Sequence, residues 1–182
     1  ENFGHIVRPD ENSEQFFDIL DDSQSNLVKL GVDFYLDDHN TFSFFTNQNF
    51  FEGGTTGMVD VRYYDDMTLD QQQDFLSMRE NMSAQYNFDY KHDFAKEGHN
   101  IELEADYNDF DSNEDATFLF MGASPLDNYM DFVDTDRSRL TVNLDYVNPM
   151  NETTKIEAGV QARVFETEIQ YNSTGETFNS SG

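Results

Sequence analysis

The feature that most constrains this chain is a pair of long alternating segments joined by a very short turn, which occurs three times. The pairs span residues 27–51, 84–110 and 139–171. Apolar and polar residues alternate along them with period two, so each segment has an apolar and a polar face, as a pleated strand does. The turns between the segments are Asp37–Asn40, Ala95–Gly98 and Asn148–Thr154. The pattern predicts three antiparallel β-hairpins.

The stretches between these hairpins lose the alternation. Residues 52–83 are rich in Gly, Gln and Asp, whereas residues 111–137 are acidic and contain Pro125. We interpret both as long loops, with room for a short helix in Met67–Met82. Residues Glu1–Asn26 are interpreted as a further polar loop with one helical turn. Short turns at one end and long loops at the other are typical of a transmembrane β-barrel.

The predicted fold class is therefore all-β, with antiparallel up-and-down hairpins that form part of a large transmembrane β-barrel. Residues 1–182 are predicted to be one partial barrel domain of six strands. Strands of about 10 residues fit a tilted crossing of a bilayer better than the usual soluble strand. Bacterial barrels start at about 8 strands and lipid tolerates no open edge, so we expect further strands before Glu1 and after Gly182 in a longer polypeptide.

Composition excludes several classes of function. Ten Lys and Arg against 37 Asp and Glu give a net charge of −27, which excludes a general affinity for nucleic acid. The 18 Phe and 9 Tyr recur at alternate positions, which argues against disorder. The chain has no Cys, and no nucleophile elbow, phosphate loop, dinucleotide fingerprint or zinc-protease motif occurs. We predict that it is not an enzyme.

The polar faces of the predicted strands supply candidate residues for a water-filled lumen. The candidates are Asp33, Glu102, Glu104, Asp106, Asp145, Glu157 and Arg163. Arg163 is the only basic residue on the polar face of its strand and is expected to pair with Asp145 or Glu157. So acidic a lumen favours cationic or neutral polar cargo, or divalent cations. Aromatic residues near the strand ends are expected to form interfacial girdles, namely Phe50, Phe51, Phe94, Tyr107, Phe110, Tyr146 and Tyr171.

Candidate metal ligands lie around the start of the second predicted loop. Asp109, Asp111, Asn113 and Asp115 place oxygen atoms at alternate positions, as a calcium loop does. The calcium-loop pattern requires Gly and Glu where Glu114 and Phe120 stand, so a calcium site and a solvated acidic loop both stay open. The same alternatives hold for Asp131, Asp134 and Asp136. His92 and His99 flank one turn without a third ligand, and we interpret them as turn residues.

Several strand-and-turn phrases resemble one known family. They are Lys29–Leu36, Tyr86–Phe94, Gly98–Ile101, Leu144–Pro149 and Lys155–Gly159. Together they resemble the barrel of TonB-dependent outer-membrane receptors of the Bacteroidetes type, the outer membrane protein beta-barrel family. In that family a strand ending Y-x-H-x-F precedes a turn, and a later strand ends D-Y-x-x-P before K-x-E-x-G. The likeness covers most of residues 27–171.

The resemblance implies a 22-stranded barrel in the outer membrane, filled by an N-terminal plug with a TonB box, and neither part is visible in this sequence. We therefore expect a segment of a TonB-dependent receptor that imports a nutrient. Its partners would be outer-membrane lipid, the TonB complex through parts absent here, and a surface lipoprotein or other outer-membrane subunits. The alternatives are a secreted acidic β-sandwich that serves as an adhesin or sugar binder, with or without calcium, and a barrel subunit that scaffolds an outer-membrane assembly.

Overall fold

The chain forms strands over nearly all of its length. The computed structural model describes residues 2–123 and 127–175. Its elements are β1 (Asn2–Arg8), the short 3-10 helix η1 (Pro9–Glu11), β2 (Ser13–Asp37), β3 (Asn40–Tyr63), β4 (Leu69–Asp93), β5 (Asn100–Gly122), β6 (Tyr129–Asn151) and β7 (Thr154–Ser173). No helix in these two ranges is long and apolar enough to cross a membrane.

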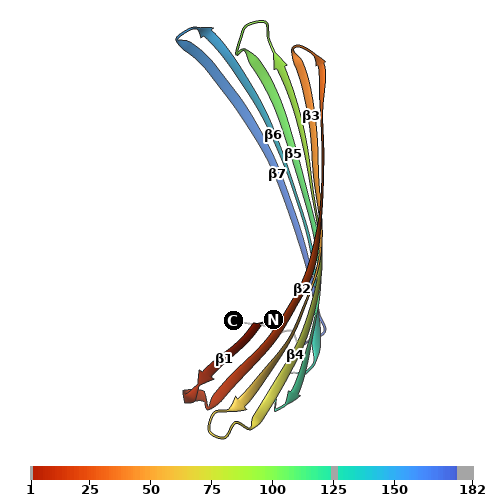
Figure 1. Cartoon of the computed structure of the whole chain (residues 1–182), viewed down its shortest axis with the longest axis vertical. Helices are drawn as coiled ribbons and strands as arrows, with labels where there is room; N and C mark the ends of the chain where they lie inside the picture. The colour runs from red at the N-terminus through yellow and green to blue at the C-terminus, as the bar shows by residue number, and fades with distance from the viewer. Residues whose placement is uncertain (1, 124–126, 176–182) are drawn as a thin grey trace, which may run out of the picture.

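The strands form one antiparallel sheet in sequence order, from β1 to β7 (Figure 1). The sheet is a single curved layer, and β1 and β7 are its two unpaired edges within the described residues. Ala84, at 6% exposure, is the only hydrophobic residue buried in that part of the chain. This confirms the predicted all-β, up-and-down antiparallel fold, with seven strands instead of six. A sandwich would need a second sheet packed on the first.

The three predicted hairpin turns are confirmed at one end of the sheet, the upper end in Figure 1. In the first turn, Asp37 pairs with Asn40, and its carboxylate accepts a hydrogen bond of 2.8 Å from the backbone N–H of His39. In the second turn, Gly98 has a φ of +72°, a conformation that favours glycine. Asn151 accepts a bond of 3.0 Å from the Thr153 N–H in the third.

The predicted long loops 52–83 and 111–137 are wrong, because both continue as paired strands. β3 and β4 stay paired from Asn40 and His92 as far as Arg62 and Leu69, and only Tyr64–Thr68 connects them. β5 and β6 are likewise paired through most of the second segment, of which residues 124–126 lie outside the described ranges. Residues 2–26 are strand too, except around η1, and no helix forms in 67–82.

The extended strands form because a hairpin that has already closed fixes the register of every later pair. Each further pair then needs no apolar side chain, only backbone hydrogen bonds and compatible neighbours. Polar cross-strand bonds supply such neighbours: Ser77 Oγ donates to Glu114 over 2.8 Å, and Ser112 Oγ donates to Asn81 over 2.5 Å. β2 and β4 therefore reach 25 residues each, about 80 Å at the usual strand rise.

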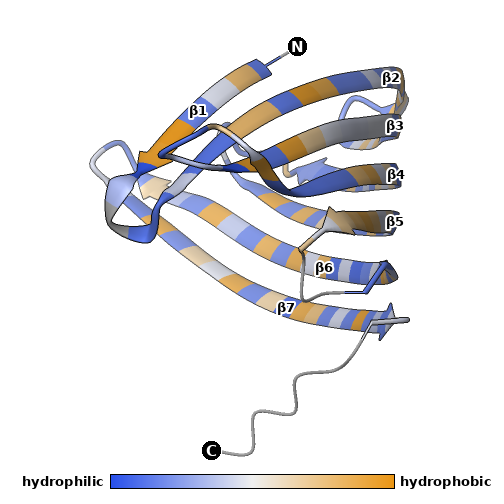
Figure 2. Cartoon of the chain, turned by 90° about the horizontal axis from the view of Figure 1, so that it is seen from below, coloured by the Kyte–Doolittle hydropathy of each residue, from blue (hydrophilic) through white to orange (hydrophobic). Residues whose placement is uncertain are grey.

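The register sorts side chains onto two faces. We call outer face the one that carries Val32, Phe44, Phe88, Ala105 and Val142, which lie in register across β2 to β6. The inner face is the opposite one. Figure 2 shows the resulting alternation of hydrophilic and hydrophobic residues along the strands. A shift of one residue in any strand would exchange its two faces.

Glycines in the polar half of the sheet make room for aromatic rings. A Cβ on Gly57 would overlap the Phe75 ring of the neighbouring strand, whereas a Cβ on Gly31 would meet Phe45 at an ordinary 3.6 Å. We predict that Gly57→Ala destabilises the β3–β4 extension by about 1 kcal/mol, because the ring must move. Gly31→Ala is the matched control and should be neutral or slightly stabilising.

Hydrogen exchange of the β3 and β4 amides measures the difference between the two variants. Equal exchange rates in both variants would contradict the close packing of Phe75 on Gly57.

Candidate lipid-facing band and inner polar face

The outer face carries an apolar band next to the three hairpin turns. The band consists of Leu30, Val32, Phe34, Phe42, Phe44, Tyr86, Phe88, Tyr90, Ile101, Leu103, Ala105, Tyr107, Leu140, Val142, Leu144, Tyr146, Ile156, Ala158, Val160, Ala162 and Val164. On β7 it runs from Ile156 to Val164, close to the 9–11 residues or so that a tilted strand needs to cross a bilayer. The band contains no charged residue.

Aromatic residues lie at both ends of the apolar band. At the turn end, Phe94 stacks on His99 with ring centroids 4.0 Å apart, and His99 Nε2 lies 3.0 Å from the Tyr146 hydroxyl. His92 packs edge-on against Phe94, so both histidines are engaged by aromatic rings, as expected of turn residues. At the other end, Tyr86 stacks on Tyr107. Such girdles mark the interfaces of membrane barrels.

The expected girdle is only partly correct. Phe50, Phe94, Tyr107 and Tyr146 belong to the outer face or to its edge. Phe51, Phe110 and Tyr171 fall on the inner face, because they stand one residue out of phase with the band.

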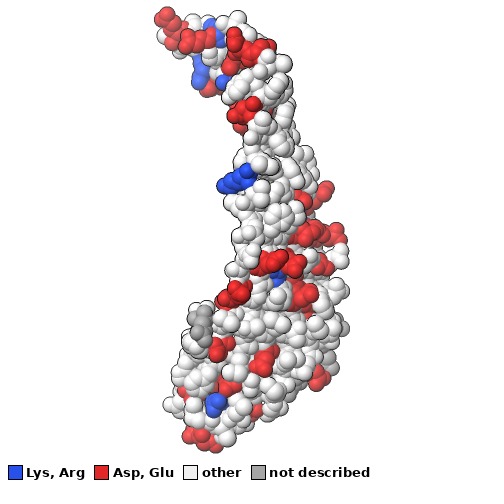
Figure 3. Space-filling view, turned by 45° about the vertical axis from the view of Figure 1, so that its right-hand side comes forward, with Lys and Arg blue, Asp and Glu red and all other residues white. Residues whose placement is uncertain are grey.

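Beyond Tyr107 the outer face changes from apolar to acidic. At the cross-strand positions that these acidic residues occupy, β2 to β7 carry no Lys or Arg on the outer face. This acidic belt comprises Asp22, Glu52, Glu80, Asp109, Asp111, Asp115, Asp134, Asp136, Glu166 and Glu168. Figure 3 shows carboxylates gathered across the middle of the molecule, next to a stretch with few charged atoms. Carboxylates without cations belong in water, so the belt limits how far the sheet can enter lipid.

The inner face at the height of the apolar band is polar. All seven lumen candidates, Asp33, Glu102, Glu104, Asp106, Asp145, Glu157 and Arg163, lie on it. Amide side chains hold some of the carboxylates: Asn87 donates to Asp106 over 3.0 Å, and Asn143 donates to Glu104 over 3.2 Å. A sheet with one apolar and one hydrated face at the same height has the pattern of a barrel wall.

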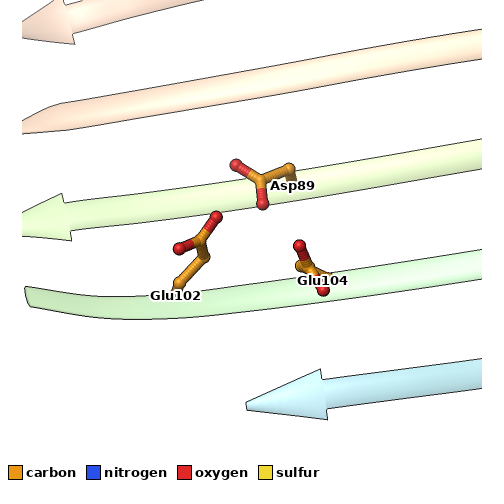
Figure 4. A group of neighbouring side chains, drawn as sticks. All are labelled: Asp89, Glu102 and Glu104. Carbon is orange, nitrogen blue, oxygen red and sulfur yellow. The ribbon is translucent and has the colours of Figure 1, made fainter. Parts of the chain in front are cut away.

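One carboxylate that sequence reasoning missed joins this set. Asp89 of β4 points toward Glu102 and Glu104 of β5, and one oxygen of each lies within 4.8 Å of the others (Figure 4). These three residues are half-buried and could hold a divalent cation between the strands. The cross-strand pairing of Asp89 with Glu104 would have revealed the cluster once the register was known.

The predicted calcium ligands do not converge. Asp109, Asp111, Asn113 and Asp115 lie on one extended strand, β5, and not in a loop. Alternate residues of a strand are almost 7 Å apart, so their side chains point outward in a row and cannot wrap around one ion. Asp131, Asp134 and Asp136 similarly lie on β6, where Asp131 faces the opposite side from the other two.

Arg163 does not form the predicted ion pair with Asp145 or Glu157 in the described part of the chain. It stands opposite Thr141, whereas Asp145 stands opposite Gly159, four residues away along β7. Its guanidinium donates instead to the Gln161 side chain over 3.4 Å. The inner face also carries Arg137 and Arg139 on β6. Neither was among the lumen candidates, since Arg137 was assigned to the loop 111–137 and Arg139 to the first position of the predicted hairpin 139–171.

Within the acidic belt, Asp111 stands directly opposite Asp136. Desolvation and then the charge of Asp136 raise the pKa of Asp111. A raised pKa means that the folded strands keep this proton longer than the unfolded chain does. The contribution of Asp111 to stability therefore falls as the pH rises from its unfolded pKa through its folded pKa, and the full penalty persists above both.

We predict that Asp111→Asn stabilises the β5–β6 pair by about 0.2–1 kcal/mol at neutral pH and flattens the pH dependence. Asp115→Asn is the matched control, because Asp115 faces Phe132 instead of a carboxylate. Denaturant titrations at several pH values check this. A larger gain from the control would refute the role of the Asp111–Asp136 pair.

The comparisons with known proteins agree with this geometry. No curated protein matches the chain. The model of the outer membrane protein beta-barrel family matches residues 92–182, half of the chain, which includes β5, β6 and β7. The chain belongs to the outer membrane protein beta-barrel family.

Proposed function

We propose that the chain forms part of the wall of an outer-membrane, TonB-dependent receptor that imports a nutrient. The observation that carries this proposal is the apolar band, continuous in register from β2 to β7, with a hydrated face behind it. In this arrangement lipid covers the outer face and the inner face lines a water-filled lumen. Further strands, from the rest of the polypeptide, would pair with β1 and β7 to close the wall.

The hairpin turns would lie at the periplasmic side. The part of each strand beyond the band would then stand outside the cell, from about 9 residues or 30 Å on β7 to about 17 residues or 55 Å on β2 and β4. Such an extension suits capture of a nutrient, or contact with a surface lipoprotein. A barrel subunit with a purely scaffolding role would share the band and the belt, so transport has to be tested separately.

Energy for uptake would reach the barrel through the TonB complex, acting on a plug outside this sequence. None of this requires a catalytic group, and we propose transport in place of enzymatic activity. Any calcium would serve as a bound ion between carboxylates such as Asp89 and Glu104, and not as a reactant.

The lipid contact is tested by two arginine substitutions at adjacent positions. Val142 lies near the middle of the apolar band, and Asn143 is the next residue, on the inner face. We predict that Val142→Arg lowers the free energy of unfolding by about 2–4 kcal/mol, because it places a charge in lipid. Asn143→Arg should change it little, since water reaches the inner face.

Urea unfolding of the whole protein in lipid vesicles measures both variants. A more harmful effect at Asn143 than at Val142 would reverse the assignment of the two faces.

Transport is tested by deleting the gene and comparing growth of the mutant with the parent on limiting amounts of single nutrients. We predict a growth defect on one nutrient class, and loss of its uptake in parent cells when a protonophore collapses the proton gradient. A deletion strain that takes up every nutrient normally, but loses other outer-membrane subunits, would favour the scaffold.

A further inference from the structure

Four arginines lie on the inner face, from the level of Asp106 upward. They are Arg79, Arg137, Arg139 and Arg163, on β4, β6 and β7. None of them makes an ion pair with any residue in the described ranges, 2–123 and 127–175. Four unpaired guanidinium groups on one face are unexpected in a chain of net charge −27. Glu114 stands opposite Arg79 without forming an ion pair, and no carboxylate stands opposite Arg137 or Arg139.

A cavity of about 330 Å³ lies beside two of them, Arg137 and Arg139. Arg137 and Arg139 line one side of it, and the rings of Phe110 and Phe165 line it as well. Asp109 also borders the cavity, but its side chain belongs to the acidic belt of the outer face. The guanidinium of Arg137 stands 5.8 Å from the centre of the Phe110 ring, which holds it in place by a cation–π contact. The cavity therefore has a positive side and two apolar ring faces.

Amide groups complete the lining. Asn47, Gln85 and Asn108 lie in one rung of the inner face, in register with Arg139. The side-chain oxygen of Asn47 is buried and accepts no hydrogen bond from the described residues. A buried acceptor without a donor is costly, so this atom points to a ligand that brings a donor into the cavity.

We propose that this cavity binds an acidic sugar. Guanidinium groups bind a carboxylate or sulfate through paired hydrogen bonds. The amides suit hydroxyl groups, and Asn47 would accept from one of them. The ring faces suit the apolar C–H face of a sugar, as in pockets where a few polar groups fix orientation on an apolar lining. This cargo differs from the cationic or neutral one that net charge alone suggests.

The inference rests on the proposed function only in taking the inner face as the water-filled side of the barrel. Binding is measured without transport, so the two proposals can fail independently. A protein that binds but does not import would leave the site assignment intact and refute the receptor role.

Calorimetry on the whole detergent-purified protein tests the site, with trigalacturonate and a chondroitin sulfate tetrasaccharide as probes and neutral maltotriose as comparison. We expect at least one acidic probe to bind with a dissociation constant below about 1 mM, and maltotriose about tenfold more weakly or worse. Failure of both acidic probes, or equal binding of maltotriose, would overturn the proposal. Inorganic sulfate that competes as well as the sugar would overturn the sugar part.

The arginines are tested by Arg137→Gln and Arg139→Gln, each expected to weaken binding about tenfold or more, the usual effect of losing a charged hydrogen bond. Arg8→Gln is the matched control, because Arg8 lies on β1 and pairs with Glu11. Arg137→Lys keeps the charge but not the paired geometry and should lose part of the affinity. Unchanged affinity in both Gln variants refutes the site.

Asn47→Ala separates a ligand contact from a structural role. Removing an acceptor that has no partner should leave the unfolding free energy unchanged or slightly higher, while binding weakens. A loss of stability with full binding would show that Asn47 serves the fold and not the ligand.

Discussion

The structure depends on one continuous register. From β2 to β7 each strand is paired with the next over almost its whole length. Each pairing places the outer-face residues of one strand opposite the outer-face residues of its neighbour. Val32, Phe44 and Phe88 can share a face with Val142 only because no pairing between them slips by one residue. The irregularities of register fall at the ends of the strands, at Tyr35/Asp37, Val61/Arg62 and Pro149/Asn151, where a shift cannot move the band. A bulge inside the band would have turned part of a strand's apolar residues to the inner face.

A single layer of this kind has little stabilisation of its own. With only Ala84 buried among the hydrophobic residues of the described chain, side chains such as Val160, 64% exposed, gain almost nothing from contacts within the sheet. Their burial has to come from what surrounds the sheet, and a bilayer supplies it on the outer face. The polar half has no such partner. It is held by backbone bonds, cross-strand side-chain bonds such as Ser25–Asn49, and rings laid over glycines, as Phe75 on Gly57.

Sequence reasoning could predict the band but not the extension, for a physical reason. A barrel wall needs an apolar and a polar face, which requires strict alternation, and this is visible in Ile101, Leu103 and Ala105 against Glu102, Glu104 and Asp106. Above the band both faces meet water or other protein, so alternation is no longer required and segments such as Gly53–Gly57 resemble loops. The sequence suggested short turns at one end of the sheet and long loops at the other. The strands in fact continue through the supposed loops, and only their residue composition changes along their length. Arg137 and Asp89 were missed because their neighbours are set by pairing across strands, which the linear pattern does not reveal.

The charges of the two faces have different consequences because they meet different surroundings. On the outer face, moving the acidic belt toward lipid would desolvate carboxylates such as Asp111 and Glu168, while moving it outward would expose the band at Leu103 and Val142 to water. Both displacements cost free energy, so the boundary near Tyr107 fixes the height of the wall. On the inner face no such boundary exists, and charge there is free to serve a ligand. The basic residues of the middle of the sheet, Lys29, Arg79, Arg137, Arg139 and Arg163, all lie on that inner face. A wall that only had to stay in the membrane would gain from placing some of them in the acidic belt, where they would relieve repulsion between carboxylates. Their absence from the belt is the physical reason to look for an anion on the inner face.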